Sequence, residues 1–453
     1  MAAGEFTMNG RDNEIYDVVG IGFGPSNLSL AIAMEEYRAD GARDGMRALF
    51  LERQPSFGWH RSMLLPSATM QISFLKDLVT FRNPTSSFSF IAYLHASGRL
   101  PRFVNNQDFF PTREEFHRYL EWAQARVADR IAYGAEVTSV GLPPGAVPET
   151  SDRLRLEVAD GRVVEARNVV ISTGLVPSMP DGAVRDERVW HSSEFLEKYR
   201  RADPAQLRRV AVVGAGQSAA EIARFLYDEL PHAQVWAVIP SYGYSVADDT
   251  PFANQVFDPG AVDDYYYATE QTREAFWRYH RNTNYSVVDG DVIRDLYRRA
   301  YEDEVRGARR LEFRNLTRVT GVKRSGAETR VSLQTGSDGE VREIDFDALV
   351  CATGYDAMEP AHLLGDLDRH CLRDESGRYR VERDYRIATD PGMRCGIYLQ
   401  GGTEHSHGLS SSLLSNIAVR SGEIADSIAA RREEGEFQDE ESGRRAVGTP
   451  LPR

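Results

Sequence analysis

A strand, a glycine-rich turn and a helix follow one another at two places in the chain. The first copy is DVVGIGFGPSN, from Asp17 to Asn27, and the second is VAVVGAGQSAAE, from Val210 to Glu221. In each copy an apolar, β-branched run ends at a glycine, and a helical apolar pattern begins a few residues later. Such turns bind dinucleotides, because the glycines admit a pyrophosphate to the backbone and the helix N-terminus faces it. Two copies therefore predict two dinucleotide-binding units.

The glycines of the first turn have separate expected roles. We expect Gly20 to permit the tight turn, Gly22 to admit the pyrophosphate, and Gly24 to let helix and strand pack closely. The contacts predicted for the first nucleotide from this turn are Gly20, Gly22, Gly24, Pro25 and Asn27.

The second turn predicts contacts from Gly214, Gly216, Gln217 and Ser218 to a second nucleotide. Ser218 stands at a helix N-terminus, where a phosphate contact and an ordinary helix cap fit equally well.

The second strand of each unit ends in a different kind of residue. Ala48–Glu52 ends in an acid, and Glu52 is expected to accept from ribose hydroxyls, the alternative being an ordinary strand-end glutamate. Val235–Ile239 is followed by Pro240 and Ser241. The absence of an acid favours NADPH over NADH, because an acid would repel the 2′-phosphate, and Ser241 is an expected contact. No arginine follows the strand either, so NADH stays possible as the second nucleotide.

These patterns predict an α/β chain with two Rossmann-like domains and a small, mostly helical substrate-binding insertion. The common pairing is FAD in the first unit and NADPH in the second; the alternative is a single-cofactor dehydrogenase with an accidental second glycine pattern. The predicted FAD domain is 13–205 and 347–431, and the NADPH domain is 206–245 and 302–346. The helical insertion is 246–301, and the disordered tails are 1–12 and 432–453.

Composition narrows the class of protein further. A net charge of −14 over 453 residues disfavours nucleic-acid binding, which needs a basic face. The chain has no apolar run long enough to span a bilayer and no signal-peptide pattern, so a cytoplasmic protein is expected. Cys351, Cys371 and Cys395 lack metal-type spacing, and we expect them in the core and expect no metal.

Seven longer segments resemble the flavin-dependent N-hydroxylating monooxygenases, and in particular the L-ornithine N5-hydroxylases of siderophore biosynthesis. The segments are GIGFGPSNLSLA at Gly20, MQISFLKDLVTFRNPTSSFSFIAYL at Met70, GAGQSAAE at Gly214, ADDTPFANQVFDP at Ala247, NTNYSVVD at Asn282, CATGYDAMEP at Cys351 and HGLSSSLLSNIAVR at His407. The resemblance extends from about Ile15 to Arg431, and NTNYSVVD is more similar to the ornithine branch than to the lysine branch.

The resemblance implies that NADPH reduces FAD and that reduced flavin and O2 form a C4a-hydroperoxyflavin. The side-chain amine of L-ornithine then attacks the distal oxygen and becomes N5-hydroxyornithine. A free alkylamine has a pKa of ~10.4, so the site must favour the neutral amine. No residue is needed as an acid or base, since the flavin supplies the reactive oxygen.

The resemblance also implies residue roles. Lys76 would pair with the substrate carboxylate, Asn254 would bind an amine of the substrate, and Asn284 would hold both the substrate and the nicotinamide ribose. Leu409 and Ser411 would close the substrate site. The further contacts expected are Trp59, His60, Met70, Gln71, Thr353 and Ser410 to FAD and Tyr285 to NADPH.

Simpler readings of these residues stay open. Lys76 also fits a solvated lysine, Asn254 and Asn284 fit turn or cap residues, and Trp59 and Met70 fit plain core residues.

Two positions depart from the family pattern. Some relatives carry an arginine just after the second strand of the NADPH unit and a lysine before the Asn-Tyr of the TNYS segment. This chain has Pro240-Ser241 and Thr283 there. We therefore expect either that positively charged residues bind the 2′-phosphate more weakly here, or that Arg281 provides the missing charge.

Other substrates and functions stay open at this stage. One alternative is a hydroxylase of lysine or of a diamine such as putrescine; Lys76 favours a substrate that carries a carboxylate. A second is an uncoupled NADPH oxidase or flavin reductase, and a third is a non-catalytic dinucleotide sensor. We expect a homodimer or homotetramer, with ornithine and O2 as the other partners.

Overall fold

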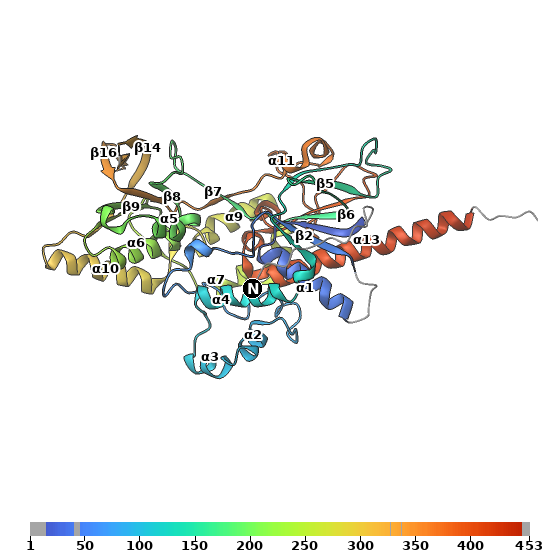
Figure 1. Cartoon of the computed structure of the whole chain (residues 1–453), viewed down its shortest axis with the longest axis horizontal. Helices are drawn as coiled ribbons and strands as arrows, with labels where there is room; N and C mark the ends of the chain where they lie inside the picture. The colour runs from blue at the N-terminus through green and yellow to red at the C-terminus, as the bar shows by residue number, and fades with distance from the viewer. Residues whose placement is uncertain (1–14, 40–45, 327, 337, 446–453) are drawn as a thin grey trace, which may run out of the picture.

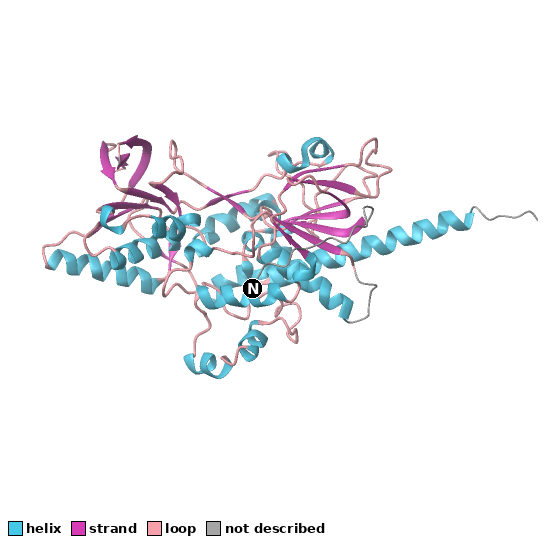
Figure 2. Ribbon diagram, viewed as in Figure 1, coloured by secondary structure: helices cyan, strands magenta, loops and turns pink. Residues whose placement is uncertain are grey.

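A computed structural model gives the architecture and describes residues 15–39, 46–326, 328–336 and 338–445. Two sheets with their covering helices lie side by side, and the last helix projects beyond the first sheet (Figures 1 and 2). The expected tail 1–12 and the last part of the expected tail 432–453, residues 446–453, lie outside the described residues.

The first glycine turn belongs to a seven-stranded sheet. Its strand order is β3-β2-β1-β6-β5-β4, with β19 also pairing with β6. Strands β1, β2, β3, β6 and β19 run parallel, whereas β4 and β5 are antiparallel. The bounds are β1 Ile15–Ile21, β2 Ala48–Glu52, β3 Ile131–Tyr133, β4 Val137–Gly141, β5 Leu154–Val158, β6 Val163–Ile171 and β19 Gly396–Leu399. The central parallel strands are continuous apolar runs because both of their faces are covered.

Helices from both ends of the chain cover one face of this sheet. They are α1 Pro25–Ala39, α2 Phe90–Ala96, α3 Leu100–Asn106, α4 Arg113–Ala125 and α13 Ile417–Arg445. Buried side chains such as Leu28, Phe116 and Ile424 join α1, α4 and α13 in one core. The other face is covered by α11 Ala361–Leu364 and the 3₁₀ segment η7 Gly365–His370.

The second glycine turn belongs to a five-stranded parallel sheet of order β13-β10-β9-β17-β8. The strands are β8 Val189–His191, β9 Arg209–Val213, β10 Gln234–Val238, β13 Leu311–Arg314 and β17 Ala348–Cys351. Helices α5 Phe195–Arg201, α6 Gln217–Glu229 and α10 Gly290–Val305 cover one face. The antiparallel strands β14 Thr317–Ser325, β15 Glu328–Thr335 and β16 Val341–Phe346 cover the other. The predicted α/β fold with two dinucleotide-binding units is confirmed.

The chain crosses between the two sheets at a two-stranded ribbon, β7 Leu175–Pro177 with β18 Tyr355–Ala357. Strand β8 precedes residue 205 and β17 follows residue 347, yet both belong to the second sheet. The predicted boundaries at 205 and 347 were therefore wrong. Both strands are short buried runs, and such runs do not reveal which sheet they join.

The predicted helical insertion divides into two parts. The first part contains helices α7 Pro251–Asn254, α8 Pro259–Tyr266 and α9 Glu270–His280. It contacts the C-terminal segment, where α8 packs against α12 Glu404–His407. Helix α10 instead packs on α6 and places Val292 and Leu296 in the core of the second sheet. The insertion therefore ends before α10. The short parallel pair β11 Ser245–Val246 and β12 Val287–Val288 closes its base.

The last helix, α13, runs to Arg445 and so passes the end expected near Arg431. The extension is rich in glutamate and arginine, which are good helix formers, and charge alone was a poor reason to expect disorder there. Within the described ranges no helix is both long enough and apolar enough to cross a membrane. The three cysteines are buried as expected, and burial raises the pKa of each thiol to about 12.

Candidate active site

A cavity of about 3260 Å³ lies between the two sheets. Both glycine turns line it, through Gly22 and Gly24 on one side and Gly214 and Gly216 on the other. Its volume is several times that of a typical small-ligand pocket, ~300–1,000 Å³. The two predicted nucleotide sites thus open into one shared space.

In the structure, the three glycines of the first turn have different roles from those expected. Gly20 packs closely, since a Cβ there would lie 2.3 Å from the Phe50 ring. Gly22 makes the turn, with φ +82° and a Cβ position 2.5 Å from the carbonyl oxygen of Ser172. A Cβ on Gly24 would meet no described atom within 4 Å and would enter the cavity. Gly24, rather than Gly22, therefore keeps space open for a ligand.

Two polar residues hold this turn in shape. The Asn27 side chain donates to the carbonyl of Gly22 at 2.7 Å, and Asn27 is fully buried. Glu52 accepts from the backbone N–H of Phe23 at 2.6 Å and of Gln54 at 2.8 Å, and it also lines the cavity. Glu52 is therefore a buried turn-supporting acid at the cavity edge and not an ordinary surface glutamate.

Buried polar atoms without partners face the cavity beside this turn. Arg420 of α13 is 2% exposed, donates to the Ser411 carbonyl, and lies 3.3 Å from the Ser26 hydroxyl at the start of α1. Its Nε and both amide atoms of the buried Gln400 find no hydrogen-bond partner among the described residues. Both residues line the cavity. An anionic ligand with many acceptors, such as a dinucleotide diphosphate, satisfies such groups.

Sequence reasoning missed both Arg420 and Gln400. The available signal for Arg420 was a basic residue within the apolar stripe of a helix, where burial costs free energy unless a partner is present. Burial lowers the pKa of Arg420, and the nearby Tyr385 and Glu423 oppose that effect.

The second turn repeats the close approach seen at Gly22. A Cβ on Gly214, whose φ is +147°, would lie 2.3 Å from the Ala352 carbonyl oxygen. Gly216 is open apart from the Ser286 Cα at 3.9 Å, and Ser218 lines the cavity at the start of α6.

The side chain of Gln217 belongs to a polar network that joins the two sheets. Its amide donates to Asp289 at 2.8 Å and to Glu221 at 3.0 Å, and its oxygen accepts from the Asp289 N–H at 2.9 Å. Gln71 also donates to Asp289 at 3.2 Å, and Arg113 pairs with both oxygens of Glu221 at 3.0 and 3.1 Å. Gln217, predicted as a nucleotide contact, therefore connects α6 to the first domain.

Three further residues predicted near the flavin have different placements. Trp59 and His60 line the cavity, with their rings 4.9 Å apart. Met70 lies instead in the core beneath α1 and α4. His60 has a positive φ of 47°. Its pKa is lowered to about 4, mainly because the surrounding protein desolvates the ring and secondly because the positive charge of Arg113 lies nearby.

The residues predicted for the substrate gather around one small apolar cluster. We define the substrate cluster as the buried Val256, Phe257 and Leu409 with the partly buried Phe276, Trp277, Tyr285 and Leu413. Lys76 lies over the Phe257 ring with its Nζ 5.6 Å from the centroid. Asn254 ends the short helix before Phe257, and Asn284 precedes Tyr285 and lines the cavity. The cluster reaches the cavity through Trp277, Tyr285 and Leu413, whereas Lys76 and Asn254 are not among the residues that line it.

The charge and amide groups of this cluster have neighbours of their own. Burial lowers the pKa of Lys76, and Asp258 opposes this effect. The Asn254 amide donates to the Asp249 carbonyl at 2.8 Å. Tyr285 donates to Glu404 at 2.5 Å, and burial raises the pKa of both groups.

The remaining predicted contacts are mostly occupied by protein partners. Thr353 lines the cavity and donates to the Ser178 carbonyl at 2.5 Å. Ser410 is buried and accepts from Asn416 at 2.9 Å, whereas the buried Ser411 hydroxyl has no partner among the described residues. Ser241 donates to the Gly243 carbonyl at 2.9 Å. Pro25 lines the cavity.

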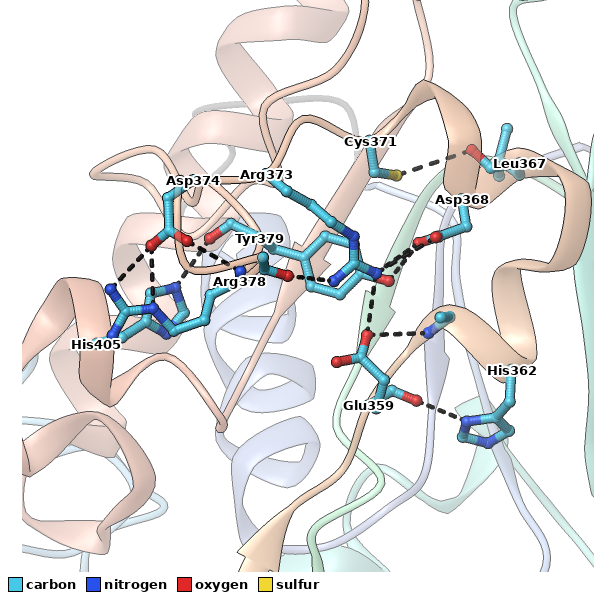
Figure 3. A network of polar contacts seen from close by, with 12 residues as sticks. Glu359, His362, Leu367, Asp368, Cys371, Arg373, Asp374, Arg378, Tyr379 and His405 are labelled. Atoms are coloured by element: carbon cyan, nitrogen blue, oxygen red, sulfur yellow. Dashed lines mark hydrogen bonds and ion pairs between the residues drawn. The ribbon is translucent and has the colours of Figure 1, made fainter.

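A polar network stiffens the cavity wall formed by residues 358–379. Arg373 bridges Glu359 and Asp368 at 3.2 and 3.1 Å and stacks over Tyr379, whose hydroxyl donates to Asp368 (Figure 3). His405 contacts the Tyr379 carbonyl at 2.8 Å. These contacts connect the wall to α12, which carries Glu404.

Comparison with known proteins identifies the family. The model of the L-lysine 6-monooxygenase/L-ornithine 5-monooxygenase family matches residues 14–357. The chain belongs to this family. It is a flavin-dependent N-hydroxylating monooxygenase by that membership. The sequence-based resemblance is therefore confirmed.

Individual relatives match the chain over almost its full length. L-ornithine N(5)-monooxygenases from Pseudomonas aeruginosa and Burkholderia cepacia are 38% and 40% identical to it. The first match covers 91% of this chain and 94% of the relative, and the second covers 87% and 90%. A solved structure of Kutzneria sp. 744 ornithine N-hydroxylase (KtzI), with reduced FAD, NADP+ and L-ornithine, is 59% identical with a TM-score of 0.89. It covers 92% of this chain and 100% of that one.

Proposed function

We propose that this monooxygenase hydroxylates the side-chain amine of L-ornithine, using FAD, NADPH and O2, and gives N5-hydroxyornithine for hydroxamate siderophore biosynthesis. The observation that carries the proposal is the shared cavity, where two glycine turns and the substrate cluster meet. Ornithine hydroxylases are prominent among the relatives that align along nearly the whole chain.

The first turn fits FAD. Gly24 leaves room for a diphosphate, and Arg420 with Gln400 offers buried donors that lack protein partners. Trp59, His60 and Gln71 line the same cavity and would hold the flavin side of the cofactor. Reduced FAD, when bound, supplies the activation of O2.

The chain's own residues would bind, orient and shield the substrate. Lys76 would pair with the ornithine carboxylate, and Asn254 and Asn284 would hold its polar groups. The apolar side chains of Phe257, Leu409 and Leu413 would exclude water and disfavour the charged ammonium, so the neutral amine reacts.

Lysine and diamines are the competing substrates. Lys76 is the feature that favours an amino acid over a diamine, because a diamine offers no carboxylate for it. The test is a parallel assay of hydroxylated product from ornithine, lysine and putrescine, with peroxide release measured alongside. Ornithine should give the highest ratio of product to peroxide. Peroxide without product from any amine would instead support an oxidase.

The cellular setting belongs to the same proposal. We propose a cytoplasmic enzyme that acts as a homodimer or homotetramer, and size measurement in solution tests the assembly.

A further inference from the structure

Two backbone segments meet where the second strand of the NADPH unit ends. The Thr317 N–H donates to the Ile239 carbonyl at 3.0 Å, and the Leu316 N–H donates to the Ser241 carbonyl at 2.9 Å. Residue 318, near the start of β14, therefore lies directly beside Pro240. Pro240, Thr317 and Arg318 all line the cavity. Figure 1 shows β14 beside the second sheet.

Arg318 is an available cation at this position. Its side chain is exposed, and no hydrogen bond or ion pair engages it within the described part of the chain. Neighbouring arginines are occupied: Arg314 pairs with Glu312 and stacks 4.0 Å over Trp236, and Arg324 pairs with Asp186 at 3.2 Å.

The chemistry of this position selects between the two nicotinamide nucleotides. In dinucleotide-binding units an acid at the end of the second strand accepts from the ribose 2′-hydroxyl, and a nearby arginine accommodates a 2′-phosphate. Here the strand is followed by the neutral Pro240, and Arg318 approaches from another strand. A guanidinium binds phosphate through paired hydrogen bonds.

We propose that Arg318 recognises the 2′-phosphate of NADPH and sets the preference of this enzyme for NADPH over NADH. The inference rests on the proposed function only in taking the second nucleotide to be a nicotinamide dinucleotide. It supplies the charge that the segment Pro240-Ser241 lacks, from a residue about 80 positions further along the chain.

Arg281 is the competing source of that charge. It also lines the cavity, but it follows α9, and its carbonyl accepts from the N–H of Tyr285 at 2.9 Å. Tyr285 in turn bonds Glu404. Arg281 therefore neighbours the substrate cluster, whereas Arg318 neighbours the end of β10.

The test is calorimetric titration of the FAD-loaded enzyme with NADP+ and with NAD+, without turnover. Arg318→Ala should weaken NADP+ binding by about 10- to 100-fold, the loss expected for a charged hydrogen-bonded contact, and leave NAD+ binding unchanged. Arg318→Glu should weaken NADP+ further and strengthen NAD+. Arg324→Ala, an exposed arginine on the same strand, is the matched control and should change neither.

The proposal would be overturned if Arg318→Ala bound NADP+ as tightly as wild type, or if it lost the same affinity for NADP+ and for NAD+. It would also be overturned if Arg281→Ala, and not Arg318→Ala, selectively weakened NADP+ binding. The retained FAD absorbance of each variant shows that it is folded. A wild-type enzyme that binds NADP+ through Arg318 but hydroxylates no amine would contradict the proposed function and leave this inference standing.

Discussion

Gln217 and Asp289 exchange two hydrogen bonds in opposite directions, one from the Gln217 amide to the Asp289 carboxylate and one from the Asp289 N–H to the Gln217 oxygen. The pair fixes the start of α6 to the start of α10. The Asp289 carboxylate also accepts a hydrogen bond from the side chain of Gln71, which belongs to the first domain. One partly buried acid therefore connects α6, α10 and the first domain at this point.

Replacing Asp289 with alanine leaves the amides of Gln217 and Gln71 without this acceptor. We expect a loss of about 1–3 kcal/mol in the free energy of unfolding, because the buried Gln217 side chain loses a hydrogen bond to a charged group. Urea unfolding measures it. Asp291→Ala is the control, since Asp291 is 92% exposed and pairs only locally with Arg294, and its loss should be under about 0.5 kcal/mol. Equal losses for the two variants would show that the network has no special role.

Alanine at Gly24 and alanine at Gly22 should have different effects. Gly24→Ala should fold with a stability within about 0.5 kcal/mol of wild type, because nothing lies near the new Cβ. It should nevertheless weaken FAD binding by at least about tenfold, since the methyl group enters the cavity. Gly22→Ala should lose more than about 1 kcal/mol of stability through its positive φ and its contact with Ser172.

Apoprotein reconstitution with FAD and denaturant unfolding together separate these two effects. A Gly24→Ala variant that binds FAD as tightly as wild type would place the diphosphate elsewhere.

Lys76→Ala should raise the KM for ornithine by about 10- to 100-fold, the effect of losing one charged hydrogen-bonded contact. NADPH should still reduce the FAD at the wild-type rate, because Lys76 lies at the substrate cluster and not at either glycine turn. Stopped-flow reduction and steady-state KM are the two measurements. Lys323→Ala, at an exposed lysine on β14, is the control. An unchanged KM would remove Lys76 from the substrate site.

His407 makes stability depend on pH. Burial, opposed by a bond to the Arg383 carbonyl, lowers its pKa to about 3 from an ordinary 6.5, and its ring stacks on Tyr385 at 4.1 Å. Between pH 6.5 and 3 the unfolded chain binds the proton and the folded chain does not. Stability is therefore complete above pH 6.5 and falls below it by up to about 1.4 kcal/mol per pH unit.

Replacing His407 with glutamine removes this titration. The stability advantage of wild type over His407→Gln, measured by urea unfolding, should shrink as pH falls from 7.5 to 5.5. An advantage that is constant over this range would mean that His407 titrates normally in the folded protein.

Local patterns predicted the two nucleotide units because each strand, turn and helix is contiguous in the chain. Glu52 was singled out for the same reason, as the end of a strand, and it lines the cavity. Residues that reach the cavity from a distance were not found. Arg420 meets Ser26 across almost 400 positions, and Arg318 reaches Pro240 through pairing of backbone segments. The sequence shows that these residues are basic, but only the packing of the sheets brings them to the cavity.

The domain limits failed for a related reason. Strands β8 and β17 are three and four residues long, and such runs carry no sign of their partners. The roles of Gly20, Gly22 and Gly24 were also misassigned, because a pattern fixes where glycines occur and not which neighbour each one meets.

The most direct test of the central claim uses isotopically labelled O2. The purified enzyme is supplied with FAD, NADPH and ornithine, and the amino acid product is analysed by mass spectrometry against the NADPH consumed. The account predicts one labelled oxygen on the side-chain nitrogen of ornithine, in a yield close to the NADPH oxidised. NADPH oxidation that delivers all of the label to hydrogen peroxide, with ornithine unchanged, would contradict it.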